Sequence, residues 1–224
     1  MEITWLGQAG LLFDTGDTKI MVDPYLSDSV GKQNPKNRRR VAVDKRFLKI
    51  TPDILICTHN HLDHTDPETL AQILNTEKAI TVLAPFDSWH AVRAFGKNHN
   101  YVMFNRLSHW TEGDIHIKAV RAEHSDKTAI GAIIQHEQTT YYLTGDTLYN
   151  DEIFPDLPAR IDVIFLPING AGNNMNMTDA QAFAEKAGAT TAVPLHFGMF
   201  DSLDPHEFAF KNKVIPQIFE VIKL

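Results

Sequence analysis

Three histidines and one aspartate fall within residues 59–64, whose sequence is HNHLDH. Neutral imidazole nitrogens and carboxylate oxygens are good ligands for a borderline cation such as Zn²⁺. On a tight loop, His59 and His61 can point at one ion while Asp63 and His64 point at a second. A solvated polar loop is the alternative, but three histidines in six positions are a strong concentration for a chain with 11 histidines. The cluster therefore predicts that one loop contributes to two metal sites.

Further ligands must come from other segments, because one loop cannot complete two metal sites. Three candidates each follow a predicted strand, namely His124, Asp146 and His196. Taken singly, a histidine after a strand is ordinarily hydrogen-bonded or exposed, and the Gly-Asp-Thr sequence around Asp146 is a common turn. Gly145 lets the backbone turn sharply before that aspartate. The joint occurrence of the three with the histidine cluster predicts that all of them meet in one cleft at the edge of a sheet.

Short apolar runs separated by glycine and aspartate predict the strands that position these residues. In the first part of the chain, strands are predicted at Ile3–Leu6, Leu11–Asp14, Lys19–Val22 and Ile54–Cys57, the last of which delivers the histidine cluster. Later strands are predicted at 80–84, 101–104, 115–120, 129–134, 140–143, 162–166, 190–194 and 219–222.

Capping residues predict the helices between these strands. They are expected from Asp66 to about Leu74, over 88–95, from Thr178 to about Ala187, and from a start at Asp204. Residues 31–40 are polar and basic and are predicted to form a loop. Strands first, followed by strands alternating with helices, predict one α/β domain over residues 1–224, with two sheets sandwiched between helices.

Length and composition limit the class of protein. The 224 residues can build a sizeable core, and 43% hydrophobic and 22% charged residues are ordinary for a soluble globular protein. A net charge of −7 disfavours a dedicated nucleic-acid binder. The lone Cys57 fits a reducing cytosol and is expected to be a small buried core residue. With no secretory signal and no membrane-spanning run, we expect a cytoplasmic protein with a small-molecule substrate.

The chain resembles the metallo-β-lactamase superfamily over nearly its whole length. The resemblance rests on the order of the candidate ligands, which is HxHxDH followed by a single His, a single Asp and a single His. The resemblance implies a four-layer αββα sandwich. The ligand sets that it implies are His59, His61 and His124 for one ion, and Asp63, His64 and His196 for a second, with Asp146 bridging the pair. Flavodiiron members of the superfamily carry Glu where His61 stands, so His61 favours a hydrolase.

Three stretches resemble the L-ascorbate-6-phosphate lactonase branch of that superfamily. They are ITWLGQAG at 3–10, DPYLSD at 23–28 and NGAGNNM at 169–175. Gln8 departs from the pattern, because a histidine commonly follows Leu-Gly there. The chain is also much shorter than the named lactonase.

The chemistry expected of such a site is metal-assisted hydrolysis. Two cations about 3.5–4 Å apart lower the pKa of a bound water, supply a bridging hydroxide and polarise the group under attack. Asp63 and Asp146 are predicted to orient that hydroxide and to handle its proton. Histidine and carboxylate ligands without cysteine favour zinc, with manganese or iron as alternatives. The expected substrate is a small, anionic ester, lactone or phosphoester.

Two weaker signals concern substrate contacts. The basic segment that includes Arg38, Arg39 and Arg40 is either a solvated loop or an anion-binding flap, because arginine forks onto phosphate. Asn169, Asn173 and Asn174 lie in a glycine-rich loop that either presents amide donors to a substrate or serves as turn chemistry.

Two further functions stay open from the sequence. One is a phosphodiesterase or nuclease, which strong salt dependence of RNA binding would indicate. The other is a non-catalytic metal-binding module, which absence of hydrolysis by fully metallated protein would indicate. The sequence neither requires nor excludes a homo-oligomer.

Overall fold

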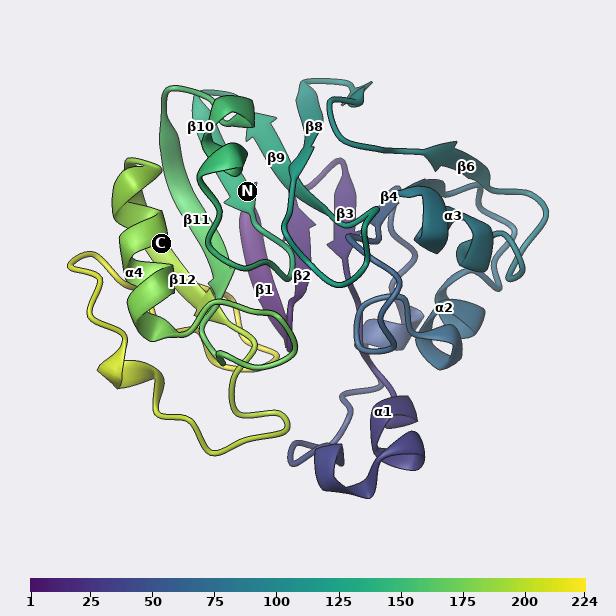
Figure 1. Cartoon of the computed structure of the whole chain (residues 1–224). Helices are drawn as coiled ribbons and strands as arrows, with labels where there is room; N and C mark the ends of the chain where they lie inside the picture. The colour runs from purple at the N-terminus through teal and green to yellow at the C-terminus, as the bar shows by residue number, and fades with distance from the viewer.

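The computed structural model describes residues 1–224 and contains two six-stranded sheets packed face to face (Figure 1). The first sheet has the order β1-β2-β3-β4-β5-β6, with β1 Glu2–Gly7, β2 Gly10–Asp14, β3 Lys19–Val22, β4 Ile54–Ile56, β5 Thr81–Ala84 and β6 Asn100–Met103. The second has the order β12-β11-β10-β9-β8-β7, with β7 His109–Glu112, β8 Ile115–Arg121, β9 Ile130–His136, β10 Thr139–Leu143, β11 Ile161–Pro167 and β12 Ala189–Leu195.

Each sheet combines antiparallel and parallel pairing. Strands β1 to β3 are antiparallel neighbours, and β3 to β6 are parallel. Strands β7 to β10 are antiparallel neighbours, and β10 to β12 are parallel. The carboxyl ends of parallel strands meet at one edge of a sheet, so each sheet has an edge where loops after several strands come together.

Helices cover the outer faces of both sheets, which confirms the predicted four-layer sandwich (Figure 1). The helices are α1 Ser29–Gln33, α2 Pro67–Ile73, α3 Phe86–Val92 and α4 Met177–Lys186. Short 3₁₀ segments lie at Pro35–Asn37, Phe47–Lys49, Asp151–Asp156 and Pro205–Glu207. No helix has the length and apolar content needed to cross a membrane.

The alternation of side chains along β4 shows why this strand is apolar throughout. Ile54 and Ile56 belong to the core between the two sheets, whereas Leu55 and the following Cys57 pack beneath α2 and α3. Successive side chains of a strand point to opposite faces, so a strand covered on both faces has no polar position. Cys57 is fully buried, as predicted, and burial raises the pKa of its thiol, so it is not a nucleophile at neutral pH.

Helix caps agree with the sequence in one case and differ in another. Asp66 caps α2 as predicted, because its side chain accepts hydrogen bonds from the backbone N–H groups of Glu68 and Thr69. For α4 the predicted cap Thr178 is wrong. The cap is Asn176, whose side chain accepts from the N–H of Asp179 and starts the helix earlier.

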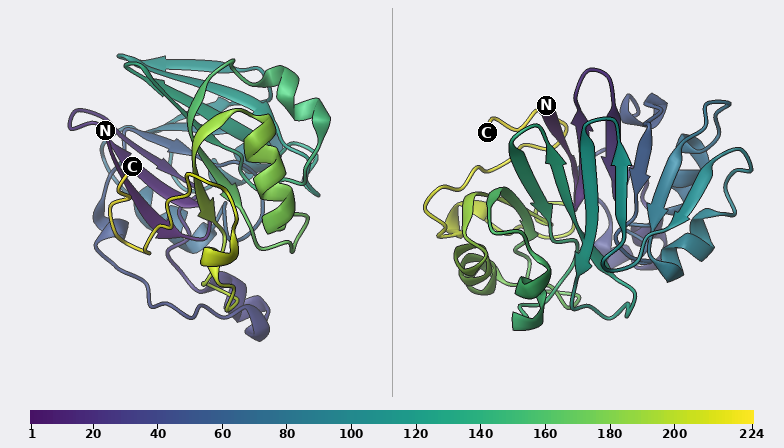
Figure 2. Two further views of the ribbon diagram at one scale, coloured as in Figure 1. Left: turned by 90° about the vertical axis from the view of Figure 1, so that its left-hand side faces the viewer. Right: turned by 90° about the horizontal axis from the view of Figure 1, so that it is seen from above.

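Other predicted elements are also corrected by the structure. Residues 31–40 are not a plain loop, since α1 and a 3₁₀ turn occupy part of the segment. The helix expected from Asp204 is a single 3₁₀ turn, Pro205–Glu207. The strand expected at 219–222 is reduced to one bridge between Val221 and Thr4, where the chain end runs beside β1 (Figure 2). Strand β7 was not predicted, because its mostly exposed residues give no alternating apolar pattern.

Candidate metal centre

Loops from both sheets converge at one end of the sandwich and bring the candidate ligands together. The first sheet supplies residues 59–64 after β4. The second supplies His124 after β8, Asp146 after β10 and His196 after β12. The candidate site therefore lies across the interface between the sheets rather than on either one alone.

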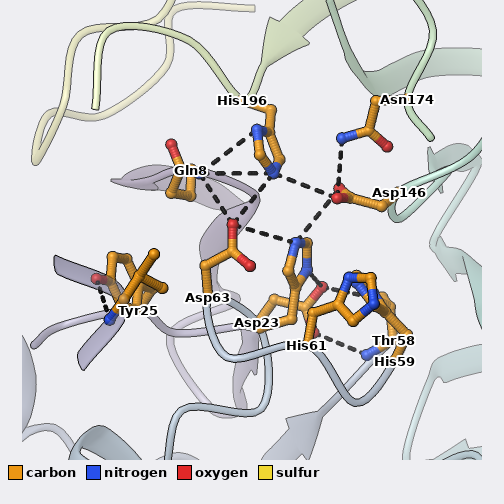
Figure 3. Close-up of polar contacts among 12 residues, drawn as sticks. Gln8, Asp23, Tyr25, Thr58, His59, His61, Asp63, Asp146, Asn174 and His196 are labelled. Atoms are coloured by element: carbon orange, nitrogen blue, oxygen red, sulfur yellow. Dashed lines mark hydrogen bonds and ion pairs between the residues drawn. The ribbon is translucent and has the colours of Figure 1, made fainter. Parts of the chain in front are cut away.

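All seven predicted ligands lie in one cluster. Their donor atoms form three overlapping groups within 4.8 Å, namely His59, His61 and His124; His59, His64 and Asp146; and Asp63, His64 and His196. Asp146 stands between the loops, with its carboxylate oxygens 3.3 Å from His64 Nε2 and 3.3 Å from His196 Nε2 (Figure 3). This placement matches the predicted ligand sets and the predicted bridging position; ligation itself stays a prediction.

Each of the five histidines has one ring nitrogen engaged outside the cluster. The outer partners are Thr58 Oγ1 for His59 (3.1 Å), Ser125 Oγ for His61 (3.2 Å), Asp23 Oδ2 for His64 (2.8 Å), the Asn173 carbonyl oxygen for His124 (3.2 Å) and the Asn169 amide for His196 (3.0 Å). The other nitrogen of each ring points into the cluster. The oxygen partners of the first four can accept from a ring N–H and so leave the inner nitrogen free as a ligand, as is usual for metal-binding histidines. The partner of His196 is the Asn169 Nδ2 donor, which orients the ring without fixing that tautomer.

Several polar atoms that face the centre of the cluster have no hydrogen-bond partner. They are His59 Nε2, His64 Nε2 and Asp146 Oδ1, all of them buried. The last two lie 3.3 Å apart, so they form an ion pair when His64 is protonated. A buried polar atom without a partner costs about 1–3 kcal/mol. Nitrogen and carboxylate donors arranged in this way fit divalent cations.

Asp23 connects both groups of ligands, a role that the sequence did not reveal. Its carboxylate accepts from the backbone N–H of Thr58 (2.7 Å) and from the Thr58 hydroxyl (2.5 Å). The hydroxyl of Thr58 thus has its lone pairs free for His59, while the same carboxylate faces His64. In the sequence, Asp23 precedes Pro24 and predicts only the end of a strand.

Gln8 is a second contact that residue types alone did not predict. Its side-chain Nε2 donates to Asp63 Oδ2 over 3.0 Å (Figure 3). Its backbone carbonyl oxygen accepts from the backbone N–H of His196 over 3.1 Å. The backbone is left-handed at Gln8, Asp23 and His196, with φ of 49°, 42° and 61°. Non-glycine residues in this region carry backbone strain, which concentrates at functional sites.

Burial and neighbouring charges shift the pKa values of the cluster in opposite directions. Burial lowers the pKa of His59 well below its usual value. For His196, burial acts in the same direction but Asp146 and Asp63 outweigh it and raise the pKa to about 10. Burial would raise the pKa of Asp146, yet His196 and His64 hold it well below its usual range. The carboxylate is therefore ionised at neutral pH and available as a ligand.

A cleft of about 430 Å³ opens beside the cluster and is lined in part by Asn169, Asn173 and Asn174. Asn169 and Asn173 therefore border the space that a substrate would enter, whereas Asn174 is buried beneath it, and substrate contact stays a prediction. Asn174 also donates its side-chain amide to Asp146 Oδ2 over 2.8 Å, so it orients a candidate ligand as well.

The three arginines predicted as substrate contacts do not line this cleft. Arg39 donates to the carbonyl oxygens of Tyr25 (2.6 Å) and Val41 (3.0 Å), and Arg38 pairs with Asp28 at 3.3 Å. Arg40 is exposed. Arg39 therefore has a structural role, because its guanidinium is held by backbone carbonyls. An anion-binding role of the segment stays a prediction that the lining of this cleft does not support.

Comparison with known proteins identifies related chains. The sequence profile of the Beta-lactamase superfamily domain matches residues 2–196. A UPF0173 metal-dependent hydrolase of Flavobacterium johnsoniae is 29% identical over 226 residues, covering 95% of this chain and 92% of that protein. Igni18, a metallo hydrolase of Ignicoccus hospitalis, has a TM-score of 0.79 at 19% identity, covering 98% of this chain and 96% of that one. An isothiocyanate hydrolase from Delia radicum gut bacteria has a TM-score of 0.76 at 18% identity, covering 100% and 99%.

Proposed function

Because the chain belongs to the metallo-β-lactamase superfamily, we propose that it is a metal-dependent hydrolase that cleaves a small ester, lactone or phosphoester at the His/Asp cluster. The observation that carries this proposal is the set of buried donor atoms without partners on His59, His64 and Asp146. Without cations, His64 and Asp146 are compensated only when His64 is protonated, and His59 Nε2 has no partner. Cations in the cluster would engage all three atoms.

The donor set supports two divalent cations, with zinc favoured by histidine-rich ligation and with manganese or iron as alternatives. His59, His61 and His124 would hold one, and Asp63, His64 and His196 the other, with Asp146 shared. When bound, such cations make water acidic enough to ionise near neutral pH and polarise the carbonyl or phosphoryl group under attack.

The two aspartates are suited to different tasks. The side chain of Asp63 is 17% exposed, whereas that of Asp146 is 6% exposed and is held by Asn174. Asp63 is therefore the carboxylate with more access to water in the cleft and is the better candidate to orient it. Burial would raise the pKa of Asp63, yet His64 and His196 hold it below its usual range, which makes this carboxylate a weak base. Asp146 has the surroundings of a rigid ligand. The buried Cys57 is excluded as an attacking group.

The test combines metal analysis with a screen of ester, lactone and phosphoester substrates. His61→Ala should remove at least one ion and lower turnover on the order of 100-fold or more, because a ligand of the cluster is lost. His206→Ala is the matched control, since His206 is exposed and lies outside the cluster. Full metal content and an unchanged rate in His61→Ala would refute the proposal.

A further inference from the structure

The cleft of about 430 Å³ that is lined by Asp63, Asp146 and His196 has no lysine or arginine in its lining. Basic side chains, among them Arg121 and Lys127, line a separate hollow on the side of His124. Outside the candidate ligands, the walls of the cleft consist mainly of amide groups, including Asn37 and Asn173, and of apolar side chains such as Val30 and Phe200. Away from the cations that the cluster would hold, an anionic group in such a space loses water without gaining a counter-charge from a basic side chain, which is unfavourable.

Lysine and arginine side chains are absent from the cleft because those of the basic segment before residue 41 are engaged elsewhere. Lys32 pairs with Glu68 at 2.6 Å, and Arg38 and Arg39 are held by Asp28 and Tyr25. The same segment does form a wall of the cleft, but it does so through Val30 and Asn37.

Asp201 is the one charged residue in the lining apart from the cluster itself. Its Oδ1 accepts from the backbone N–H groups of Gly198 and Leu203, both over 3.0 Å, so the side chain is held in place. Its other oxygen makes no hydrogen bond within the protein. A fixed carboxylate with a free oxygen accepts hydrogen bonds from a substrate and repels a negative charge.

The walls of the cleft are tied to each other, which preserves this lining. The N–H of Arg40 donates to the carbonyl oxygen of Met199 over 3.0 Å, and the rings of Tyr25 and Phe200 lie 5.8 Å apart in an edge-on contact. The segment before residue 41 and the loop that carries Asp201 therefore hold a preformed cleft, of a size suited to a small molecule.

We propose that this hydrolase takes a small, non-anionic substrate whose part remote from the scissile bond presents hydroxyl or amide hydrogen-bond donors. Asp201 accepts from these donors and selects against anions. The inference rests on the proposed function and narrows it to uncharged esters and lactones, leaving out phosphomonoesters and phosphodiesters. It takes the place of the anionic substrate expected from the sequence.

The test uses hydroxamates, which anchor on bound metal through one end, and needs no turnover. Two hydroxamates of equal chain length, ending in a hydroxyl or in a carboxylate, are titrated calorimetrically into zinc-reconstituted protein at low ionic strength. The hydroxyl compound should bind more tightly, on the order of three- to tenfold, because one like-charge repulsion is absent.

Variants then assign the discrimination to one side chain. Asp201→Asn keeps an oxygen that accepts from Gly198 and Leu203 but removes the charge, so carboxylate binding should improve by a similar factor while hydroxyl binding changes less than about twofold. Asp204→Asn is the matched control, because Asp204 also caps a turn but does not line the cleft.

Three outcomes decide between the proposals. Tighter binding of the carboxylate compound by the unmodified protein, or an Asp201→Asn variant with unchanged discrimination, overturns the inference alone. If the protein takes up no zinc at the cluster and neither compound binds, the proposed function is overturned, and the inference falls with it.

Discussion

The orientation of a histidine ligand depends on the hydrogen-bond partner of its outer ring nitrogen. In this cluster one carboxylate, that of Asp23, supports two histidines, His59 and His64. Asp23 reaches His64 directly and His59 through the hydroxyl of Thr58. It is 1% exposed, so its charge is compensated by these contacts rather than by water. The first and second groups of ligands therefore share a single support.

Replacing Asp23 by Asn should weaken metal binding by about 10–100-fold, because Asn cannot accept from Thr58 and His64 with the same charge. Competition with a chromophoric chelator measures this affinity. Asp53→Asn is the matched control, since Asp53 also accepts a backbone N–H, from Lys19 over 2.8 Å, but belongs to none of the candidate metal-binding groups. Equal affinities in both variants would contradict the shared support.

The sequence predicted the ligand residues better than their supports. Residues 59–64, together with His124, Asp146 and His196, are recognisable because their types and order are informative by themselves. Asp23 and Gln8 act only once β1, β3 and β4 are assembled, and in the sequence they belong to an ordinary strand end and an ordinary turn. The left-handed φ of Gln8 belongs to the two-residue turn that joins β1 to β2, and the residue type at neither position predicts a left-handed backbone.

At the level of elements, the turn after β10 shows how backbone geometry delivers a ligand. Gly145 has a φ of +61°, and a Cβ there would lie 2.8 Å from the Ile130 carbonyl oxygen and 3.1 Å from Thr58 Cβ. The loop after β10 can therefore pass this close to the loop after β4 only because residue 145 has no side chain. Asp146 follows directly and is placed by this approach.

Gly145→Ala should lower the free energy of unfolding by on the order of 3 kcal/mol and reduce the metal content, because the chain must shift at the ligand loop. Gly113→Ala is the control. Its φ of +57° carries the left-handed penalty of about 1–2 kcal/mol, but nothing lies within 4 Å of a Cβ there. Chemical denaturation and metal analysis test the pair, and equal losses of stability would contradict the steric argument.

Strands were more predictable than helix boundaries for a physical reason. Runs such as the one through Leu55 are apolar because both faces of their sheet are covered, and this signal is strong. The start of α4 depended on which of several polar residues captured a free N–H, and Asn176 did so in place of Thr178. Strand β7 and the reduced segment at 219–222 lie at edges, where burial is weak and patterns are poor.

For the whole molecule, cations in this cluster would link the two sheets, since ligands come from loops of both. Binding to the native state alone stabilises it, by about 2.7 kcal/mol at a metal concentration 100 times the Kd. Without metal, the stability of the fold should instead follow the protonation of the cluster.

The melting temperature of metal-free protein should peak near about pH 6.5, the usual histidine pKa. The pKa of His196 is raised to about 10 in the folded protein. Its contribution to the free energy of unfolding is therefore full below about pH 6.5 and is lost as the pH rises toward 10. The pKa of His59 is lowered in the folded protein. On acidification the unfolded chain therefore binds a proton at His59 that the folded chain does not, and the free energy of unfolding falls. The lowered pKa of Asp146 adds a further loss below about pH 4.

Metal-loaded protein should show a much smaller loss on the alkaline side, because cations take the place of the protons on His64 and His196. Thermal melts from pH 5 to pH 10, with and without a chelator, test this difference. Parallel curves for the two samples would contradict the assignment of these histidines as ligands.

The most direct measurement is an anomalous-diffraction map of crystals grown from zinc-loaded protein. Two peaks are expected, one among His59, His61 and His124 and one among Asp63, His64 and His196, with Asp146 reaching both. A map with no peak in the cluster, or with zinc bound only elsewhere on the chain, would contradict a metal-dependent hydrolase built on these side chains.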